Sequence, residues 1–282
     1  MKQRIITALW GLPILIAIIW FGDVWFGEPW LFTLLIAAAA ILGIGEFYRL
    51  TARGGIEPLK FLGLVFALLF LANAYFDFPT LSLLAFDFPY TLPLLAAAII
   101  LPLIWLLFRP PREMAFINWA WTLAGILYVG WMLGYWVALR GLDQGKGWVF
   151  LALFSTFACD TGAFFVGRAW GKHPLTPTIS PGKTWEGAIG GFLASPAATL
   201  IIYTILNLVH ITLPLGYTGT ILIGCLIGIF AQLGDLAESL LKRSVGVKDS
   251  GSLIPGHGGV LDRIDSVVFT GIIAYYYVIW LG

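Results

Sequence analysis

Charged residues are scarce in this sequence. Asp, Glu, Lys and Arg together make up 11% of its 282 residues, and the formal net charge is +1. No stretch is long and hydrophilic enough to form a separate water-soluble domain, and no nucleic-acid partner is expected. The few charges that are present therefore carry most of the information about function.

Cysteine is also rare. Cys159 and Cys225 are the only two, and both lie in apolar surroundings in the sequence. They provide neither a disulfide framework nor a CxxC metal site, so both are expected to be buried free thiols. Internal repeats, low-complexity tracts and linkers are missing as well. The chain is therefore predicted to be a single membrane domain, 1–282, with an N-terminal transmembrane part, 1–140, and a catalytic part, 141–282.

Long apolar segments dominate the rest of the chain. Hydrophobic residues make up 60% of it, and the mean hydropathy is +0.91, which indicates a polytopic membrane protein. Continuous apolar runs of about 17–25 residues suit membrane-crossing helices, whereas a β-barrel would show alternating segments of about ten residues. The predicted fold class is all-α, with about nine transmembrane helices at 5–22, 30–48, 60–76, 91–108, 118–138, 147–167, 187–209, 216–234 and 265–281.

Lys and Arg are distributed unevenly between the two sides of this arrangement. With the N-terminus in the cytoplasm, Arg140 and Lys146 fall outside and the other fourteen of the 16 basic residues fall inside, as the positive-inside rule requires. The N-terminus is therefore predicted to be cytoplasmic, and any chemistry is expected at the cytoplasmic face of a bacterial plasma membrane, in the loops 168–187 and 235–265. The first apolar segment is interpreted as an uncleaved span and not as a signal peptide.

Two carboxylates lie inside predicted spans. Glu46 is interpreted as a side chain that reaches the interface and pairs with Arg49 or Arg53; the alternative is that it faces a polar cavity. Asp160 lies two to three turns from the inner end of its span, where inserting an ionised Asp costs about 2.5–3.5 kcal/mol. Both a functional site and a structural partner would explain Asp160, and the functional explanation is favoured.

A second group of polar residues follows that span. The sequence Ser180-Pro181-Gly182 predicts a turn, after which a helix begins with Glu186 in its first turn. A helix N-terminus attracts anions, and Lys183 and Thr184 add a positive charge and a hydroxyl donor. A P-loop is excluded because position 177, where its first Gly would stand, is Pro. Lys183 is interpreted as a phosphate contact, and the simpler alternative is a charge that only sets topology.

Carboxylates gather at the two ends of the loop 235–265. Asp262 and Asp265 share one face of the last helix, and if the two helix ends are neighbours they converge with Asp235. The three carboxylates would repel one another unless a cation bound them. Oxygen ligands suit Mg²⁺, which accepts substrate phosphates as further ligands. The alternative is that these are ordinary helix caps and surface ion pairs. The helix that contains Asp235 carries three further polar residues on the same face, Glu238, Ser239 and Lys242.

Basic residues and one histidine lie close to these carboxylates in the sequence. The positive charges suit a triphosphate better than they suit carboxylates alone. His257 is a candidate phosphate donor or proton-transfer base, although a single His in a turn is more often a structural hydrogen-bonding residue. The basic residues are Lys242, Arg243, Lys248 and Arg263.

The segment 239–265 resembles the signature of the phosphatidate cytidylyltransferases, also called CDP-diacylglycerol synthases. It contains S-x-L-K-R, then K-D-x-G four residues later, then P-x-H-G-G-V-x-D-R-I-D. The D-T-x-A and S-P-x-K-T-x-E-G motifs of the family are matched by 160–163 and 180–187. This resemblance is specific over 155–266, and before residue 155 only the hydropathy agrees.

The resemblance implies a homodimeric membrane nucleotidyltransferase of phospholipid biosynthesis that joins CTP to phosphatidate, giving CDP-diacylglycerol and diphosphate. It implies Mg²⁺ at Asp235, Asp262 and Asp265, with a monovalent cation such as K⁺ beside it. The expected catalytic residues are these three aspartates with Lys242 and Arg243. The expected substrate-binding residues are Asp160, Ser180, Lys183, Thr184, Glu186, Ser239, Lys248, Asp249, His257, Gly258, Gly259 and Arg263.

The chemistry of this reaction is consistent with the residues present. A phosphomonoester with a second pKa of about 6 is largely dianionic at neutral pH and needs little help from a base. Catalysis then depends on positioning and charge neutralisation. Two other functions are left open. The first is a CTP-dependent polyprenol-type lipid kinase, which would need a base such as His257 or Asp160. The second is an ion-coupled transporter that uses Asp160 and Glu46. Such a transporter would need a pair of broken helices at corresponding positions of two repeats, and the sequence shows no such repeat.

Overall fold

The computed structural model describes residues 2–22, 29–76, 90–108, 113–247, 250–251 and 258–281, with side chains from residue 9 onward. The chain divides into two compact units. Unit 1 consists of Met1–Gly141 and Ser244–Arg263, and unit 2 consists of Leu142–Arg243 and Ile264–Gly282. The first border falls after Gly141, one residue beyond the predicted start of the catalytic part at 141. The segment Ser244–Arg263, which the sequence analysis assigned to that part, belongs to unit 1, and the single-domain prediction stays a prediction.

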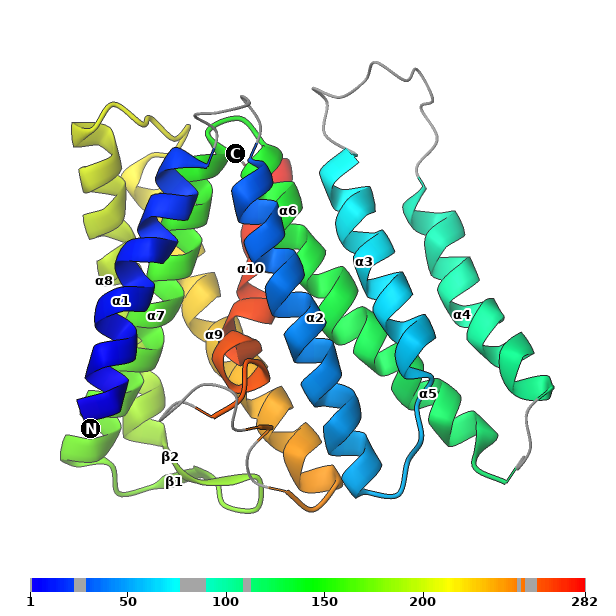
Figure 1. The fold of residues 1–282 in the computed structure, drawn as a ribbon. Helices are drawn as coiled ribbons and strands as arrows, with labels where there is room; N and C mark the ends of the chain where they lie inside the picture. The colour runs from blue at the N-terminus through cyan, green and yellow to red at the C-terminus, as the bar shows by residue number, and fades with distance from the viewer. Residues whose placement is uncertain are drawn as a thin grey trace. The chain divides into compact units, whose positions relative to one another are not determined.

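Unit 1 is a bundle of apolar helices (Figure 1). Phe66, Phe70, Ala98 and Ile126 form a buried hydrophobic cluster in it. The Tyr48 ring is packed where a side chain at Gly63 or Gly125 would overlap it, and its hydroxyl donates to the carbonyl of Thr122 over 2.8 Å. The helices are α1 (Lys2–Phe21), α2 (Trp30–Arg53), α3 (Lys60–Phe76), α4 (Thr91–Leu107), α5 (Ala115–Gly125), the π-helix η2 (Ile126–Trp131) and α6 (Met132–Gly141).

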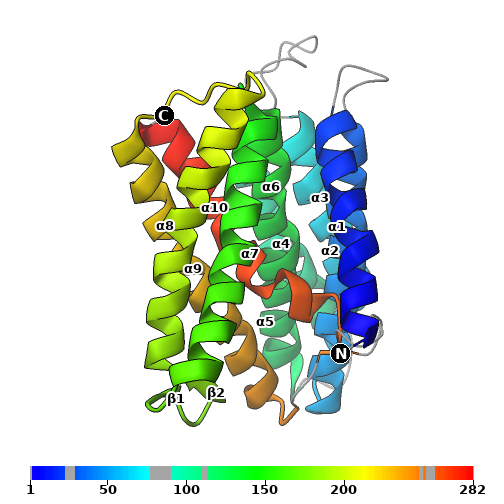
Figure 2. The same ribbon diagram turned by 90° about the vertical axis from the view of Figure 1, so that its left-hand side faces the viewer.

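Unit 2 contains long helices and one β-hairpin (Figure 2). Small residues and buried hydroxyls hold its helices together, as is usual in membranes, where apolar surfaces alone provide little driving force. A Cβ atom on Gly190 would lie 2.5 Å from Val166, and the Ser155 and Thr199 hydroxyls lie 2.8 Å apart. The elements are α7 (Gly145–Trp170), β1 (Pro174–Thr176), β2 (Ser180–Thr184), α8 (Trp185–Leu208), α9 (Tyr217–Ser244) and α10 (Leu261–Leu281), the last of which enters unit 2 at Ile264.

The all-α prediction is confirmed apart from the two-stranded hairpin. Six helices of the described chain are long and apolar enough to cross a membrane: α2, the continuous α5–η2–α6 segment, α7, α8, α9 and α10. The other predicted spans coincide with shorter apolar helices, Leu9–Phe21, Lys60–Phe76 and Thr91–Leu107. The chain is therefore a multi-pass membrane protein, while nine spans and a cytoplasmic N-terminus stay predictions.

Candidate active site

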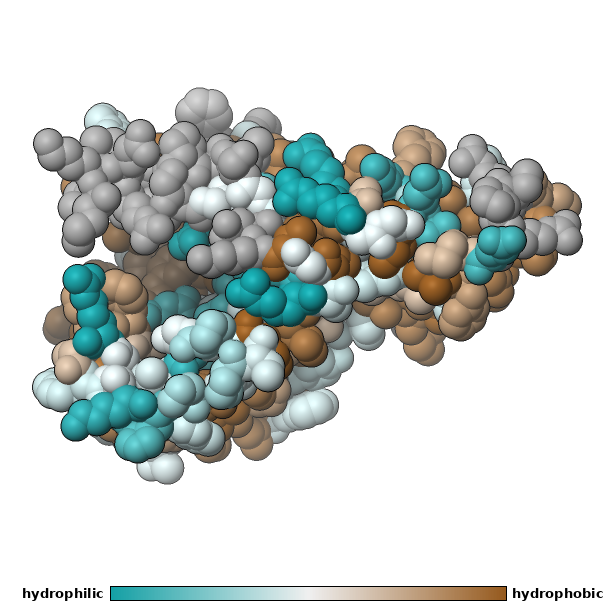
Figure 3. Space-filling view, turned by 90° about the horizontal axis from the view of Figure 1, so that it is seen from below, coloured by the Kyte–Doolittle hydropathy of each residue, from teal (hydrophilic) through white to brown (hydrophobic). Residues whose placement is uncertain are grey.

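The hairpin after α7 carries the first group of predicted site residues. β1 and β2 are antiparallel, and Thr176 pairs with Ser180. The predicted turn at Ser180–Gly182 is wrong, because these residues form strand β2 and the turn lies at 177–179. Pro181 is tolerated because a two-stranded hairpin consists of edge strands. Figure 3 views the face on which this hairpin lies, where hydrophilic side chains are interspersed with apolar ones.

The start of α8 is confirmed and is fixed by its own side chains. Thr184 is the N-cap residue, and its hydroxyl accepts a hydrogen bond from the Gly187 amide over 3.2 Å. Glu186 lies in the first turn, where a carboxylate is stabilised by the helix dipole. Its Oε2 accepts from the amides of Lys172 and His173 at 3.1 and 3.2 Å, and its Oε1 lies 2.5 Å from Nδ1 of His173. Both predicted site residues thus also tie the hairpin to α8.

Lys183 forms an ion pair with a predicted metal ligand. Its Nζ atom lies 2.7 Å from Oδ2 of Asp235 on α9. The two side chains are 25% and 35% exposed, although the Nζ atom of Lys183 is itself buried. Lys183 was interpreted as a phosphate contact, and the structure instead records it beside a carboxylate. Because Asp235 lies 52 positions further along the chain, the residues around Lys183 in the sequence do not predict this ion pair.

Asp265 lies near several other carboxylates of unit 2. Its charge interacts with those of Asp235, Glu238 and Asp160. Its Oδ1 accepts from the Ser266 amide over 2.7 Å. The Ser266 hydroxyl donates to Oδ1 of Asp160 over 3.2 Å, which gives Asp160 the structural partner that the sequence analysis weighed. The functional explanation of Asp160 stays a prediction.

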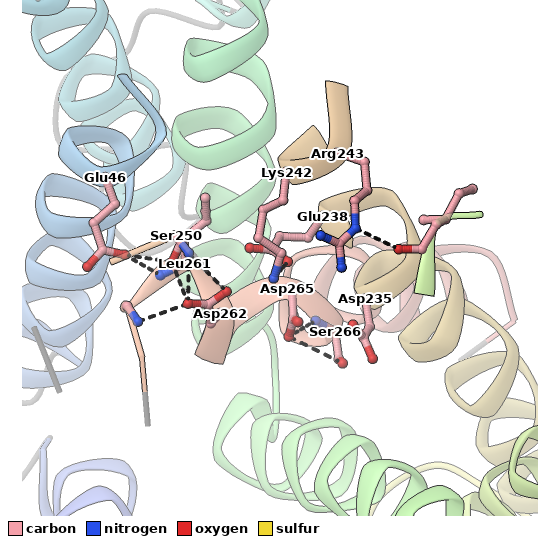
Figure 4. A network of polar contacts seen from close by, with 12 residues as sticks. Glu46, Asp235, Glu238, Lys242, Arg243, Ser250, Leu261, Asp262, Asp265 and Ser266 are labelled. Carbon is pink, nitrogen blue, oxygen red and sulfur yellow. Dashed lines mark hydrogen bonds and ion pairs between the residues drawn. The ribbon is translucent and has the colours of Figure 1, made fainter. Parts of the chain in front are cut away.

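The end of α9 adds two basic residues to the same part of unit 2. α9 runs without interruption to Ser244, so the predicted polar face of Asp235, Glu238, Ser239 and Lys242 lies on one helix. Lys242 pairs with Glu238, whose side chain is 0% exposed. Arg243 donates from Nε to the carbonyl of Ile179 in the hairpin turn, over 3.0 Å. Figure 4 shows Asp235, Glu238, Lys242 and Arg243 together with Asp265 and Ser266.

Unit 1 contributes a separate polar network around the N-terminus of α10 (Figure 4). Oδ2 of Asp262 accepts from the Ser250 hydroxyl at 2.7 Å, the Ser250 amide at 3.1 Å and the Gly259 amide at 2.9 Å. Gly258 has a φ of +80°, a backbone conformation that favours glycine. The predicted site residues Asp262, Gly258 and Gly259 are thus brought together here.

Glu46 belongs to this network, and its preferred interpretation was wrong. The side chain is buried against other residues of unit 1 and not exposed to solvent, since Glu46 is only 3% exposed. Its Oε2 accepts from the Leu261 amide over 2.8 Å and from the Ser250 hydroxyl over 3.3 Å. The alternative, a polar interior, is closer to what is found. The sequence analysis singled out Glu46 but not its hydrogen-bond partners, which lie 204 and 215 positions away.

For the remaining predicted site residues, the structure gives burial only or no description. Ser239 is buried on α9 and Arg263 is exposed on α10. Lys248, Asp249 and His257 lie outside the described residues. Across the described ranges, no three His, Cys, Asp or Glu side chains gather closely enough to hold a metal ion. The convergence of Asp235, Asp262 and Asp265, which belong to different units, therefore stays a prediction.

The donor chemistry present nevertheless suits Mg²⁺. Asp235 and Asp265 provide hard oxygen ligands whose charges repel each other. Mg²⁺ commonly binds through one or two carboxylates plus substrate phosphates, without an all-protein cage. An incomplete protein ligand set is thus compatible with a cation that arrives with its substrate.

These features define a class: a multi-pass α-helical membrane protein with a charged polar site made of carboxylates, lysines and a helix N-terminus. The chain belongs to the cytidylyltransferase family, whose sequence model matches residues 2–281. It is 35% identical over 280 residues to the phosphatidate cytidylyltransferase of Bacillus subtilis, covering 98% of this chain and 97% of that protein. The Synechocystis phosphatidate cytidylyltransferase is 34% identical, with coverages of 99% and 97%. A chloroplastic phosphatidate cytidylyltransferase of Arabidopsis thaliana is 34% identical, with coverages of 91% and 68%.

Proposed function

We propose that this protein is a phosphatidate cytidylyltransferase, which converts CTP and phosphatidate into CDP-diacylglycerol and diphosphate. The observation that carries the proposal is the family match over residues 2–281, together with relatives of that name aligned over nearly the whole chain. The lysines of unit 2 agree with it, because both substrates are phosphorylated and need positive charge around them. The carboxylates agree with it as oxygen ligands for a cation that accompanies the phosphates.

In the proposed reaction, an oxygen of the lipid phosphate attacks the α-phosphorus of CTP. A new P–O bond forms, the bond between the α-phosphorus and the α–β bridging oxygen breaks, and diphosphate leaves with that oxygen. Because the attacking group is already an anion, the protein has to align two polyanions and neutralise their charge more than it has to remove a proton. His257 is therefore not required as a base.

The residues of unit 2 divide this work in the proposal. Lys183 binds a phosphate of CTP after exchanging its ion pair with Asp235 for the nucleotide, and the α8 N-terminus behind it orients the same phosphates. Lys242 and Arg243 receive the leaving diphosphate, and Arg243 is already held against the hairpin turn. Asp160, Ser180 and Ser239 contact the substrates in this scheme. The other residues proposed to bind substrate, Lys248, Asp249, Gly258, Gly259 and Arg263, belong to unit 1.

Mg²⁺ is proposed to bind at Asp235, Asp262 and Asp265 and, when bound, neutralises charge between the two phosphates. A monovalent cation such as K⁺ is proposed beside it. The site is proposed to face the cytoplasm of a bacterial plasma membrane, where CTP arrives from water while the acyl chains stay in lipid. The family resemblance also supports a homodimer.

The test uses purified protein in detergent with CTP labelled at either the α- or the γ-phosphate, and with phosphatidate or a polyprenol as acceptor. The proposal predicts that α-label enters a lipid product only with phosphatidate, and that γ-label leaves as diphosphate. Transfer of γ-label to the polyprenol would instead identify a lipid kinase. No labelled lipid with either acceptor, from protein whose monodispersity has been verified, would contradict both enzyme functions.

A further inference from the structure

A buried carboxylate from the N-terminal half of the chain holds the start of the last helix. Glu46 lies on α2 and is buried, with only 3% of it exposed. Its Oε2 accepts from the Leu261 amide, the first residue of α10, over 2.8 Å. Since the first amides of a helix have no partner within the helix, an acceptor from elsewhere stabilises its start.

The backbone around Glu46 is shaped to let the carboxylate in. A Cβ atom on Gly259 would overlap both Oε2 of Glu46 and the Ser250 hydroxyl, and a Cβ on Gly251 would lie 2.8 Å from Oε1. Glycine at these two positions therefore lets the backbone pass directly over the carboxylate. Such a close approach requires that the Glu46 side chain stays in one place.

Asp262 depends on the same segment. The Ser250 hydroxyl lies 2.7 Å from Oδ2 of Asp262 and 3.3 Å from Oε2 of Glu46. With its single proton it donates to one carboxylate at a time, and the shorter distance favours Asp262. Glu46 thus restrains Asp262 in two ways. It accepts from the amide of Leu261, which precedes Asp262 in the chain, and it lies beside Ser250, which hydrogen-bonds Asp262.

We propose that Glu46 is a positioning residue that sets the α10 N-terminus and thereby the orientation of the Asp262 carboxylate. The inference rests on the proposed function, in which Asp262 acts at the phosphates. Glu46 itself touches neither substrate. Removing it releases the Leu261 amide and the Ser250 segment, and a displacement of about 1 Å at a reacting centre lowers the rate by up to about a hundredfold.

The test compares Glu46→Ala, Glu46→Asp and Glu46→Gln in the full chain. Gln keeps an acceptor oxygen at the same reach, whereas Ala removes the acceptor and Asp is one methylene too short. We expect Ala and Asp to lower kcat about tenfold or more and to raise the half-saturating Mg²⁺ concentration, with little change in KM for CTP. Gln is expected to restore most of kcat.

A second readout uses no substrate. Hydrogen–deuterium exchange of peptides covering 258–266, in protein without Mg²⁺ or CTP, is expected to speed up in Ala and Asp and to stay near wild type in Gln. This measurement tests the positioning even if phosphatidate is not the substrate. An inactive wild type would overturn the proposed function, whereas unchanged exchange in Glu46→Ala would overturn the positioning role.

Tyr48→Phe is the matched control. Tyr48 lies on α2 two residues beyond Glu46, is buried, and hydrogen-bonds Thr122 away from α10. Removing the Tyr48 hydroxyl costs about 1 kcal/mol of stability. This substitution is expected to leave kcat and the hydrogen–deuterium exchange of 258–266 unchanged. If Tyr48→Phe and Glu46→Ala lower the melting temperature equally and also lower kcat equally, then Glu46 has a merely structural role. If Glu46→Ala does not fold, Ser250→Ala takes its place. Ser250→Ala is expected to raise the half-saturating Mg²⁺ concentration. An unchanged half-saturating concentration would overturn the proposal.

Discussion

Lys183 illustrates how a single side chain can serve two partners in succession. In the structure it neutralises Asp235 over 2.7 Å, and the proposed reaction needs its charge at a nucleotide phosphate. The Nζ atom is buried although the rest of the side chain is partly exposed. Exchanging the pair for a phosphate keeps a negative partner at this buried nitrogen.

Lys183→Ala tests this exchange. We expect KM for CTP to rise about tenfold, with a smaller change in KM for phosphatidate, because one charge-assisted contact to the nucleotide is lost. Steady-state kinetics in detergent measure both constants. Lys172→Ala removes an exposed lysine from the same loop and is expected to behave as wild type. An unchanged CTP dependence of Lys183→Ala would refute the nucleotide role.

Asp265→Asn tests the carboxylate cluster. Asp265 lies near three other acidic side chains, Asp235, Glu238 and Asp160, so replacing its acid with a neutral amide is expected to leave the melting temperature equal or higher. Turnover is expected to fall below about a tenth of wild type, because an amide replaces an anionic ligand. Asp143→Asn, in a loop of the same unit, is the control. Retained turnover in Asp265→Asn would remove Asp265 from the proposed metal ligands.

The sequence predicted some single residues correctly and failed at others for a physical reason. Thr184 and Glu186 were placed at a helix start because capping is local and leaves a short pattern. Glu46 was misjudged because its hydrogen-bond donors, Ser250 and Leu261, are distant in sequence while two arginines lie close by. Contacts of that kind leave no spacing that a single sequence reveals.

At the scale of elements, the contact between α9 and α10 places the carboxylates. A Cβ atom at Gly234 would lie 2.5 Å from the backbone carbonyl of Asp265. The two helices therefore approach each other at the position where one carries Asp235 and the other Asp265. Backbone atoms cannot move aside as a flexible side chain does.

Gly234→Ala is expected to separate these helices. Alanine favours a helix by about 1 kcal/mol, but the overlap with backbone costs about 1–3 kcal/mol, so the melting temperature should fall and turnover should fall with it. Gly11→Ala is the matched control, since Gly11 is helical and a Cβ there meets nothing within 4 Å. Differential scanning fluorimetry and the CTP assay measure both effects. A Gly234→Ala variant as stable and active as wild type would contradict the close approach.

Hydrophobic run length predicted the helices but not their irregularities. All of the predicted spans are helical in the structure, and the segment 60–76 has the predicted bounds. The π-helix Ile126–Trp131 within a predicted continuous span was missed, because nothing in its composition distinguishes it from α-helix. The turn at Ser180–Gly182 was misplaced because the pairing of β2 with β1 prevailed over the local preference of Pro-Gly.

At the scale of the whole molecule, the orientation in the membrane has consequences for substrate access. The positive-inside count predicts that the β1–β2 hairpin lies on the cytoplasmic side, where CTP is available. The hairpin turn at 177–179 exposes Thr178, whereas Asp143 lies in a loop predicted to face the other side.

Cysteine labelling tests this orientation. In a Cys159→Ala, Cys225→Ala background, Thr178→Cys is expected to react with a membrane-impermeant maleimide in inverted vesicles and not in intact cells. Asp143→Cys is the control and is expected to show the opposite pattern. Labelling of Thr178→Cys from outside intact cells would reverse the predicted topology and place the hairpin away from CTP.

The hydrogen bonds of Glu46 also set an order of events during synthesis. The acceptor is made 204 positions before Ser250 and 215 positions before Leu261, which at translation rates of about 5–20 residues per second is a delay on the order of ten to forty seconds. During that interval Glu46 has neither of these two donors. A ribosome that stops before codon 250 therefore releases a chain in which the hydrogen bonds of Glu46 to Ser250 and Leu261 cannot form.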